Sequence, residues 1–452
     1  MSDTLNTRAM SGFVELLPRQ QAVFDKAKAA VLDEYRSHGF APIETPAIDR
    51  AEILFSKAGG EMEKEIYRVA KTGRDDLALR FDLTVPMARY IAEHAGEITF
   101  PFKCSQIGRS YRGERAQKGR YREFYQADID IVAENSLDTA YDAEVIATAA
   151  AAVRRIAALF GLGGFTVRVS NRQAWTDFFA ENAVPADTAG AVLALLDRKL
   201  KMPPEDFERA LDAFGPLAPK IRALTDKGAA AHPDLARAME LLAMLGVPAK
   251  ADLSIVRGLD YYTGSVFETF FDDRPELGSV ASGGRYANLV SRMSRRNIIG
   301  AGGSIGLSRL LVPIIEKGEF PLAGPDAAII PVSPAQAGAA MQTEHRLALG
   351  GAAASAFLNG ASLKKNMELA NKSGARFVLI VGEDECKSGQ FTLKNMLTGE
   401  QGKHDLDGIL EKILAGERDG NRFGGLAGGT GPLGGHGLGG LAGGTAEGAG
   451  AA

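Results

Sequence analysis

Cysteine is almost absent from this chain, and long apolar runs are missing altogether. Only Cys104 and Cys386 occur among 452 residues, with no CxxC spacing, which argues against a disulfide framework and against a zinc site. The opening segment MSDTLNTRAMSG lacks the apolar core of a secretory signal, and no apolar stretch approaches the roughly 20 residues that a membrane helix needs. We therefore expect a cytoplasmic protein with reduced thiols, no membrane segment and no zinc.

Strong net charge and clustered histidine are also missing. The formal charge of −4 and the pI near 6.0 exclude a general polycation, although they permit a local basic patch that could meet phosphate. The histidines have no metal-ligand spacing, so surface or core roles are favoured over metal binding or catalysis. They are His38, His94, His232, His345, His404 and His436.

Glycine-rich phosphate loops are the third absence. The chain contains no GxxxxGK[ST] motif, and its glycine run GAGGSIG at 300–306 fails the GxGxxG pattern because Ile305 occupies the last glycine position. Any nucleotide must then be held by side chains, for which the bidentate fork of arginine is well suited.

The length and the pattern of apolar residues indicate two or three domains, since single cores rarely grow past roughly 250–300 residues. Apolar periodicity predicts helices over 18–38, 86–95 and 137–160, and strands over 77–85, 165–169 and 254–271. Residues 173–250 predict a helical insertion. A boundary lies near 322–325, beyond which apolar strands at 327–332 and 376–381 predict a small α/β module. From Asp419 onward the repeated GGLAGGT segments predict a disordered tail.

An arginine-rich hairpin is the most informative feature that the chain does contain. Residues 108–132 read GRSYRGERAQKGRYREFYQADIDIV. Strand alternation places Gln126, Asp128 and Asp130 on one face, with Tyr125 and Ala127 on the other. In the same way, the predicted strand 77–85 places Arg80, Asp82 and Thr84 on one face. A hairpin of cations that leads into an acidic face indicates a binding site for a phosphate ligand and a cationic ligand.

Each of these polar features also has a structural explanation. A half-exposed strand normally shows polar residues to water, so either acidic face alone could simply be solvated. The cluster Glu383-Asp384-Glu385 is better explained as a solvated turn than as a magnesium site. Lys364 and Lys365 could contact RNA phosphate or face water, and the sequence leaves both open.

Several motifs together resemble the class II aminoacyl-tRNA synthetases. Helix 18–38 with IETP at 43–46 is similar to motif 1, YRGER at 111–115 with RYREFYQ at 120–126 to motif 2, and GAGGSIGLSR at 300–309 to motif 3. RGLDYY at 257–262 and SGGRY at 282–286 resemble the histidine-specific branch and its paralogues. The resemblance covers about residues 12–410.

The resemblance implies roles for particular residues. Arg112 would contact the α-phosphate of ATP and Arg257 would be the catalytic arginine. The implied ATP site is Arg112, Glu114, Arg120, Phe124 and Arg309; the implied histidine site is Asp82, Thr84, Arg112, Gln126, Asp130, Arg257, Tyr261, Tyr262 and Tyr286. Magnesium would come with ATP rather than sit in a protein cage.

The resemblance also implies an α+β fold and a set of partners. We expect a class II catalytic domain at 1–322 with a mixed, mainly antiparallel sheet, the insertion at about 173–250, and an anticodon-binding α/β domain at 326–413. The tail would be 419–452. The expected partners are L-histidine, ATP, tRNA(His) and a second subunit of a homodimer.

Three departures from the family pattern accompany the motifs. Ser308 stands where motif 3 usually has glutamate, Ala116 replaces the usual proline of the motif 2 loop, and residues 353–356 are richer in alanine than usual. The loop change predicts weaker dependence on an extra 5′ guanosine of the tRNA.

Two further functional readings compete with a synthetase. The chain could be a regulatory paralogue that senses histidine for ATP phosphoribosyltransferase, but such paralogues tend to lose the catalytic arginine segment and the anticodon domain, both retained here. A purely structural role would require Arg112 and Arg257 to be dispensable for activity.

Overall fold

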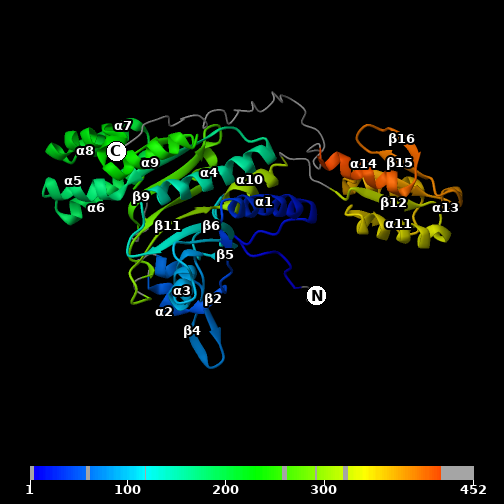
Figure 1. The fold of residues 1–452 in the computed structure, drawn as a ribbon, viewed down its shortest axis with the longest axis horizontal. Coiled ribbons are helices and arrows are strands. Elements are labelled where there is room, and N and C mark those ends of the chain that lie inside the picture. The colour runs from blue at the N-terminus through cyan, green and yellow to red at the C-terminus, as the bar shows by residue number, and fades with distance from the viewer. Residues whose placement is uncertain are drawn as a thin grey trace, which may run out of the picture. The chain divides into compact units, whose positions relative to one another are not determined.

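The computed structural model describes residues 5–56, 62–117, 119–256, 262–290, 293–318 and 324–418. It divides into two compact units, residues 1–322 and 323–452 (Figure 1). The predicted tail at 419–452 lies outside the described residues. Within the described ranges no helix combines the length and apolarity needed to cross a membrane.

An eight-stranded sheet forms the centre of the first unit. Its strand order is β1-β5-β6-β11-β10-β9-β7-β8. Neighbouring strands run antiparallel except in the pairs β1–β5 and β7–β8. The strands are β1 Ala41–Pro42, β5 Phe102–Tyr111, β6 Glu123–Glu134, β7 Phe165–Asn171, β8 Ala249–Ala251, β9 Tyr262–Phe271, β10 Ala281–Tyr286 and β11 Ile298–Ile305. This mixed, mainly antiparallel sheet agrees with the predicted fold class.

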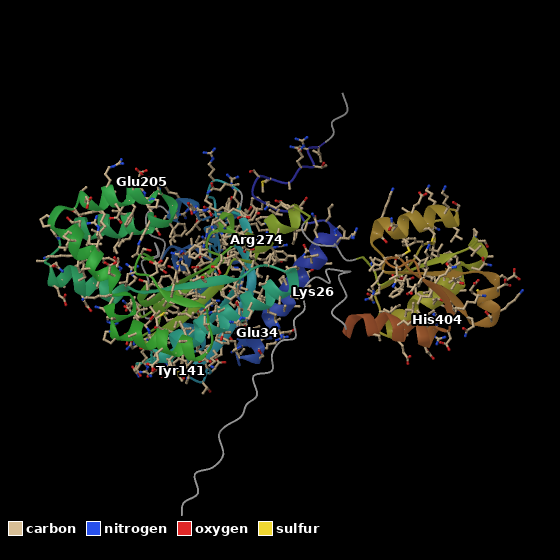
Figure 2. The ribbon with its side chains drawn as sticks, turned by 90° about the horizontal axis from the view of Figure 1, so that it is seen from above. Lys26, Glu34, Tyr141, Glu205, Arg274 and His404 are labelled. Carbon is tan, nitrogen blue, oxygen red and sulfur yellow. The ribbon has the colours of Figure 1, made fainter. Side chains whose placement is uncertain are left out.

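Helices α1 Pro18–Ser37 and α4 Ala140–Phe160 pack against one face of this sheet (Figure 1). The apolar stripe of α1 is buried there: Tyr35 donates its hydroxyl to the carbonyl of Ala127 on β6 at 3.0 Å, and Phe24 meets the ring of Tyr125 at 5.3 Å. Among the charged side chains of α1, Glu34 pairs with Arg155 of α4 at 3.3 Å (Figure 2 labels Glu34). The alternate residues of β6 therefore point away from these helices, toward the opposite face.

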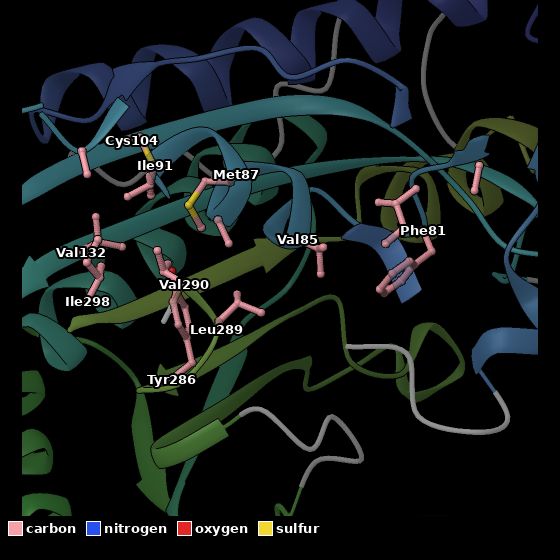
Figure 3. Close-up of a cluster of buried hydrophobic side chains, with 14 of the residues drawn as sticks. Phe81, Val85, Met87, Ile91, Cys104, Val132, Tyr286, Leu289, Val290 and Ile298 are labelled. Atoms are coloured by element: carbon pink, nitrogen blue, oxygen red, sulfur yellow. The ribbon is translucent and has the colours of Figure 1, made fainter. Parts of the chain in front are cut away.

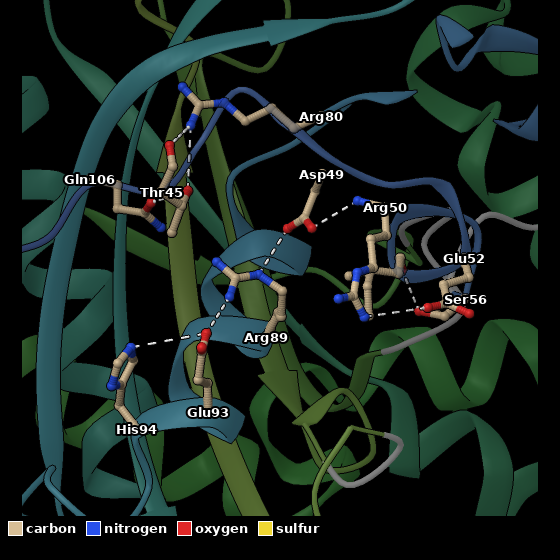
Figure 4. A network of polar contacts seen from close by, with 11 residues as sticks. Thr45, Asp49, Arg50, Glu52, Ser56, Arg80, Arg89, Glu93, His94 and Gln106 are labelled. Atoms are coloured by element: carbon tan, nitrogen blue, oxygen red, sulfur yellow. Dashed lines mark hydrogen bonds and ion pairs between the residues drawn. The ribbon is translucent and has the colours of Figure 1, made fainter. Parts of the chain in front are cut away.

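A smaller sheet and two helices extend the first unit. The elements are β2 Ile48–Arg50, α2 Ala51–Phe55, β3 Arg68–Lys71, β4 Arg74–Leu79 and α3 Thr84–His94. Apolar side chains of α3, including Met87 and Ile91, pack with Val132 and Ile298 of the large sheet (Figure 3). On its polar side, Arg89 binds Asp49 at 2.8 Å (Figure 4). The segment is thus held to the large sheet by one apolar face.

The predicted strand at 77–85 is wrong in its second half. Strand β4 ends at Leu79, and helix α3 begins at Thr84. A carboxylate oxygen of Asp82 accepts the backbone N–H of Val85 at 3.0 Å, which satisfies one of the free donors at the start of the helix. Asp82 and Thr84 therefore reach the site from a turn and a helix start rather than from one strand face.

Five helices form the predicted insertion. They are α5 Arg172–Glu181, α6 Ala186–Asp197, α7 Pro204–Asp212, α8 Ala218–Asp226 and α9 Pro233–Met244. Their apolar positions are buried among themselves, for example Leu196 of α6 and Phe207 of α7, while polar residues such as Glu205 lie at the surface (Figure 2). The chain then returns to the large sheet through β8. Helix α10 Leu307–Glu316 closes the first unit.

The second unit is a five-stranded α/β module. Its order is β13-β12-β14-β15-β16, with β12 parallel to both β13 and β14. The strands are β12 Ala327–Pro331, β13 Ala354–Ala356, β14 Phe377–Val381, β15 Phe391–Asn395 and β16 Gln401–His404; the helices are α11 Ala337–Leu349, α12 Leu363–Ser373, α13 Glu383–Ser388 and α14 Leu406–Arg418. Two apolar clusters lie on the two sides of β12.

The acidic cluster at 383–385 differs from the turn predicted for it. The three residues form the first turn of helix α13, where Glu385 accepts the backbone N–H of Gly382 at 3.1 Å. Acidic side chains are favoured at a helix start because the free N–H groups carry partial positive charge. The cluster is explained by helix capping.

Candidate active site

A cavity of about 930 Å³ opens on the face of the large sheet that α1 and α4 leave free. Residues from β6, β9, β10, β11 and the connection between β5 and β6 line it. The sequence-predicted site residues that it brings together are Asp82, Thr84, Arg112, Glu114, Arg120, Phe124, Gln126, Asp130, Tyr262, Tyr286 and Arg309. Arg257 and Tyr261 lie outside the described residues.

Arg112 stands just beyond the end of β5, at the mouth of the hairpin. Its Nε donates to the carbonyl of Phe81 at 3.0 Å, and its guanidinium lies 5.1 Å from the ring centroid of Phe124 on β6. One edge of the guanidinium is thus fixed by the backbone while the ring supports its plane. The remaining N–H donors can serve a bidentate anion such as a phosphate.

The hairpin connection holds a second cation beside a carboxylate. Arg120 lies 3.4 Å from Glu114, and its side chain is 47% exposed. Arg309 of α10 donates to the carbonyls of Gly119 and Ser279 at 3.2 and 3.0 Å. These two bonds join the connection to the body of the unit, so the arginine has a structural task in addition to its place in the cavity wall.

Gln126, Asp128 and Asp130 form a row along the cavity face of β6. The register pairs Asp128 with Gln106 of β5 and Ser304 of β11, and Asp130 with Gly302 of β11. The side-chain nitrogen of Gln126 donates to the hydroxyl of Ser304 at 2.9 Å. The face predicted from alternation is therefore the floor of the cavity.

Two tyrosines from β9 and β10 close the far end of this row. Tyr286 is 1% exposed and donates its hydroxyl to Asp130 at 2.7 Å. Tyr262 is its partner across the strand pair and also lines the cavity. The two carry the aromatic hydroxyls at the deep end, where a planar heterocycle could be bound between them and Asp130.

The glycines of β11 make room for these side chains. A Cβ at Gly302 would overlap the carboxylate of Asp130, and a Cβ at Gly300 would overlap the ring of Tyr286. The glycine run is therefore needed for the close approach of side chains to the backbone, which agrees with its rejection as a dinucleotide motif.

Burial raises the pKa of the three buried carboxyl groups that line the cavity. It brings the pKa of Asp82 to about 6 and that of Asp128 to about 7, and it holds the pKa of Asp130 well above its usual range. The desolvation of a carboxylate is the largest cause in each case, and neighbouring carboxylates add to it for Asp128 and Asp130. A cation bound among these carboxyl groups would lower their pKa values again.

Two serines that sequence reasoning did not assign have clear positions here. Ser308 accepts the backbone N–H of Tyr125 at 2.8 Å, so the residue that departs from motif 3 ties α10 to β6. Ser304 bridges toward Gln126 and Asp128. Alternation along residues 298–305 could have placed Ser304 on the cavity face, but nothing in the sequence showed which strand would pair with β11.

Resident metal ligands are not grouped in the described part of the chain. No set of three or more His, Cys, Asp or Glu residues there has the arrangement to hold an ion. The acidic residue nearest the hairpin cations, Glu114, already pairs with Arg120.

Comparisons with known proteins bear on both units. Residues 12–310 match the family model of histidyl-tRNA synthetase, and residues 326–416 match that of an anticodon binding domain. A histidine–tRNA ligase of Stenotrophomonas maltophilia is 36% identical to this chain, and the match covers 90% of this chain and 98% of the relative. A histidine–tRNA ligase of Clostridium tetani is also 36% identical, and the match covers 91% of this chain and 99% of the relative. The crystal structure of histidyl-tRNA synthetase from Nostoc sp. PCC 7120 superposes with a TM-score of 0.80 at 30% identity, covering 91% of this chain and all of that one.

Proposed function

The chain belongs to the histidyl-tRNA synthetase family, and from that membership we propose the residues by which it acts as an ATP-dependent histidine–tRNA ligase. The enzyme activates L-histidine with ATP, forming histidyl-adenylate and pyrophosphate, and then transfers histidine to the 3′ end of tRNA(His). The observation that carries the assignment of residues is one hairpin: its arginine end and its carboxylate end open into the same cavity.

ATP binds at the arginine end of the cavity. Arg112 contacts the α-phosphate with the donors that Phe81 leaves free, and Glu114 with Arg120 holds the rest of the bent polyphosphate. The adenine stacks between Phe124 and Arg309. Mg²⁺ enters on the phosphates of ATP, whose charge it neutralises when bound.

L-Histidine binds at the carboxylate end. Its ammonium group meets Asp82, Thr84 and Gln126, which all line the cavity. The imidazole lies against Asp130, Tyr262 and Tyr286, and Tyr261 completes the pocket. The hydroxyl that Tyr286 donates to Asp130 keeps that carboxylate aimed at the ring nitrogen.

Positioning and charge stabilisation supply most of the rate. A carboxylate oxygen of histidine attacks the α-phosphorus in line, and the bond to the β-phosphate oxygen breaks to release pyrophosphate. Arg112 and Arg257 offset the charge that develops on the α-phosphate oxygens. In the second step a ribose hydroxyl of the terminal adenosine attacks the acyl carbon, and AMP leaves.

The remaining assignments follow the two units. Residues 1–322 act as the catalytic domain with its insertion at 173–250, and residues 326–413 bind the anticodon. The enzyme works in the cytoplasm as a homodimer. The match of residues 326–416 to the anticodon-binding model supports the assignment of the second unit, and it disfavours the regulatory paralogue, which tends to lack this module.

Two assays test the proposal. Purified protein with Mg²⁺ should exchange labelled pyrophosphate into ATP only when L-histidine is present, and it should then charge tRNA(His) transcripts. Binding to ATP phosphoribosyltransferase without any tRNA charging would instead establish the regulatory role. Transcripts with and without an extra 5′ guanosine should differ little in charging rate, because Ala116 departs from the usual motif 2 loop.

A further inference from the structure

Three buried carboxylates meet in the cavity, and all three accept hydrogen bonds from the fold. Asp82 accepts the backbone N–H of Val85 at 3.0 Å, at the start of α3. Asp130 accepts the hydroxyl of Tyr286 at 2.7 Å. Each of these groups therefore has one oxygen engaged by the fold itself.

Asp128, to which the family resemblance assigns no role, has a hydrogen bond from Ser304 but also keeps one buried oxygen without a partner within the described ranges. It is 2% exposed, it lines the cavity, and its Oδ1 has no hydrogen-bond partner within the described ranges. Nor does any ion pair of the described residues include it. A buried ionised oxygen without a partner is costly, by roughly 1–3 kcal/mol or more, so the arrangement points to a partner that arrives with the substrate.

The neighbours of Asp128 leave its Oδ1 without a partner. The hydroxyl of Ser304 on β11 hydrogen-bonds the carboxylate, yet Oδ1 stays unpartnered within the described ranges. Gln106, beside it on β5, accepts the hydroxyl of Thr45 at 2.9 Å and donates its amide to the carbonyl of Leu83 at 3.2 Å (Figure 4 draws the bond to Thr45). Arg80 donates to the carbonyls of Thr45 and Arg109. The side chains of Gln106 and Arg80 therefore use these hydrogen bonds on Thr45, Leu83 and Arg109 rather than on Asp128.

A second unused acceptor lies next along the strand. The Oε1 of Gln126 is buried and has no hydrogen-bond partner within the described ranges, while its amide nitrogen is held by Ser304. Residues two apart on one strand lie about 7 Å from each other at the backbone, so one small group between them can reach both side chains. Two buried acceptors facing the same space suit a group with several N–H donors.

We infer that the carboxylate of Asp128 is a substrate-binding residue that pairs with the α-ammonium of histidine, together with Oε1 of Gln126. This inference rests on the proposed function and adds a second carboxylate, beside Asp82, to the site of the ammonium group. The ammonium carries three donors, enough for Asp128, Gln126 and Asp82. The imidazole then contacts Asp130, which lies two residues further along β6 and is hydrogen-bonded to Tyr286.

The test compares ligands that keep or lack the amine. In Asp128→Asn, we expect the dissociation constants of L-histidine and L-histidinol to rise about thirtyfold, the loss of one charged hydrogen bond. The affinity for 3-(imidazol-4-yl)propionate, which has the ring but no amine, should stay within about twofold of the wild type. Glu134→Gln, a neutralised carboxylate on the same strand that pairs with Arg296 outside the cavity, is the matched control and should bind all three ligands as the wild type does.

Other outcomes decide against the inference. Equal weakening of all three ligands would make Asp128 a ring or packing residue, and unchanged affinity for L-histidinol would also overturn its role. If Asp128→Asn did not fold, Asp128→Ser should show the same amine-selective loss. A wild-type protein without histidine-dependent exchange would refute the proposed function itself, whereas an active wild type with an unaffected variant would refute only this inference.

Discussion

The two halves of strand β6 carry charge in opposite ways. Around its start, charges are half-exposed and already paired: Arg109 lies 3.6 Å from Glu123, and Arg120 lies 3.4 Å from Glu114 in the adjoining connection. Further along, Asp128 and Asp130 are 2–3% exposed and make no ion pair among the described residues. One strand thus passes from exchangeable surface ion pairs to buried carboxylates that are hydrogen-bonded to the hydroxyls of Ser304 and Tyr286.

The difference matches the two substrates that the hairpin must bring together. A polyphosphate is a large anion, and half-exposed arginines can release a carboxylate partner and take a phosphate at little cost. The ammonium of an amino acid is a single charge, which is bound strongly where carboxylates are buried without other partners. The phosphate site and the ammonium site therefore differ in how deeply their charged side chains are buried, rather than in how many charges they contain.

The largest expected effect concerns the arginine end. Arg112→Ala should lower kcat/KM for histidine-dependent pyrophosphate exchange by about 10²–10³-fold, because it removes donors aimed at the reacting phosphate. Arg109→Ala, which removes a half-exposed arginine over Tyr125 in the same hairpin, should change it less than about threefold. Similar losses in both variants would mean that general positive charge, and not the position of Arg112, attracts ATP.

A second change tests the carboxylate end through its glycine. Gly302→Ala should raise the KM for histidine about thirtyfold and leave the KM for ATP unchanged, because the new methyl group overlaps the carboxylate of Asp130. Gly306→Ala is the control, since its Cβ would meet nothing closer than 3.4 Å. A raised KM for both substrates in Gly302→Ala would show that the two ends are not separable.

A smaller effect is expected at the aromatic ring of the arginine end. Phe124→Leu keeps an apolar side chain but loses the ring face beside Arg112. The KM for ATP should rise about fivefold, the equivalent of one stacking contact, with the KM for histidine unaffected. Steady-state exchange at varied ATP measures this, and a change confined to histidine would place the adenine elsewhere.

The smallest expected effect is on stability and depends on pH. Because burial raises the pKa of Asp128 to about 7, the folded state holds its proton more tightly than the unfolded state. This contribution is complete below the unfolded pKa near 4 and is lost as the pH rises through about 7. Without ligands, the melting temperature of Asp128→Asn relative to the wild type should therefore be about 3 °C higher at pH 8 than at pH 5. An equal difference at both pH values would show that Asp128 is neutralised by another group.

Much of the first unit was predictable because it rests on local geometry. The helix predicted over 18–38 and the acidic row predicted from the alternation of β6 are both found in the structure, since helix and strand periods are set by the backbone. The prediction failed at 80–85, where Asp82 caps a helix; alternating residues in a short segment do not distinguish a strand from a turn that leads into a helix.

By itself, the sequence determined which side chains share a face of β6 and in what order, because a period of two follows from strand geometry alone. Only the tertiary structure decided which of those carboxylate oxygens has a partner. That depends on Tyr286 and Gly302, more than 150 residues further along the chain, and on strands that meet only after folding. Burial and pairing are properties of the assembled cavity, and they separate Asp128 from Asp130, its neighbour on the same face of β6.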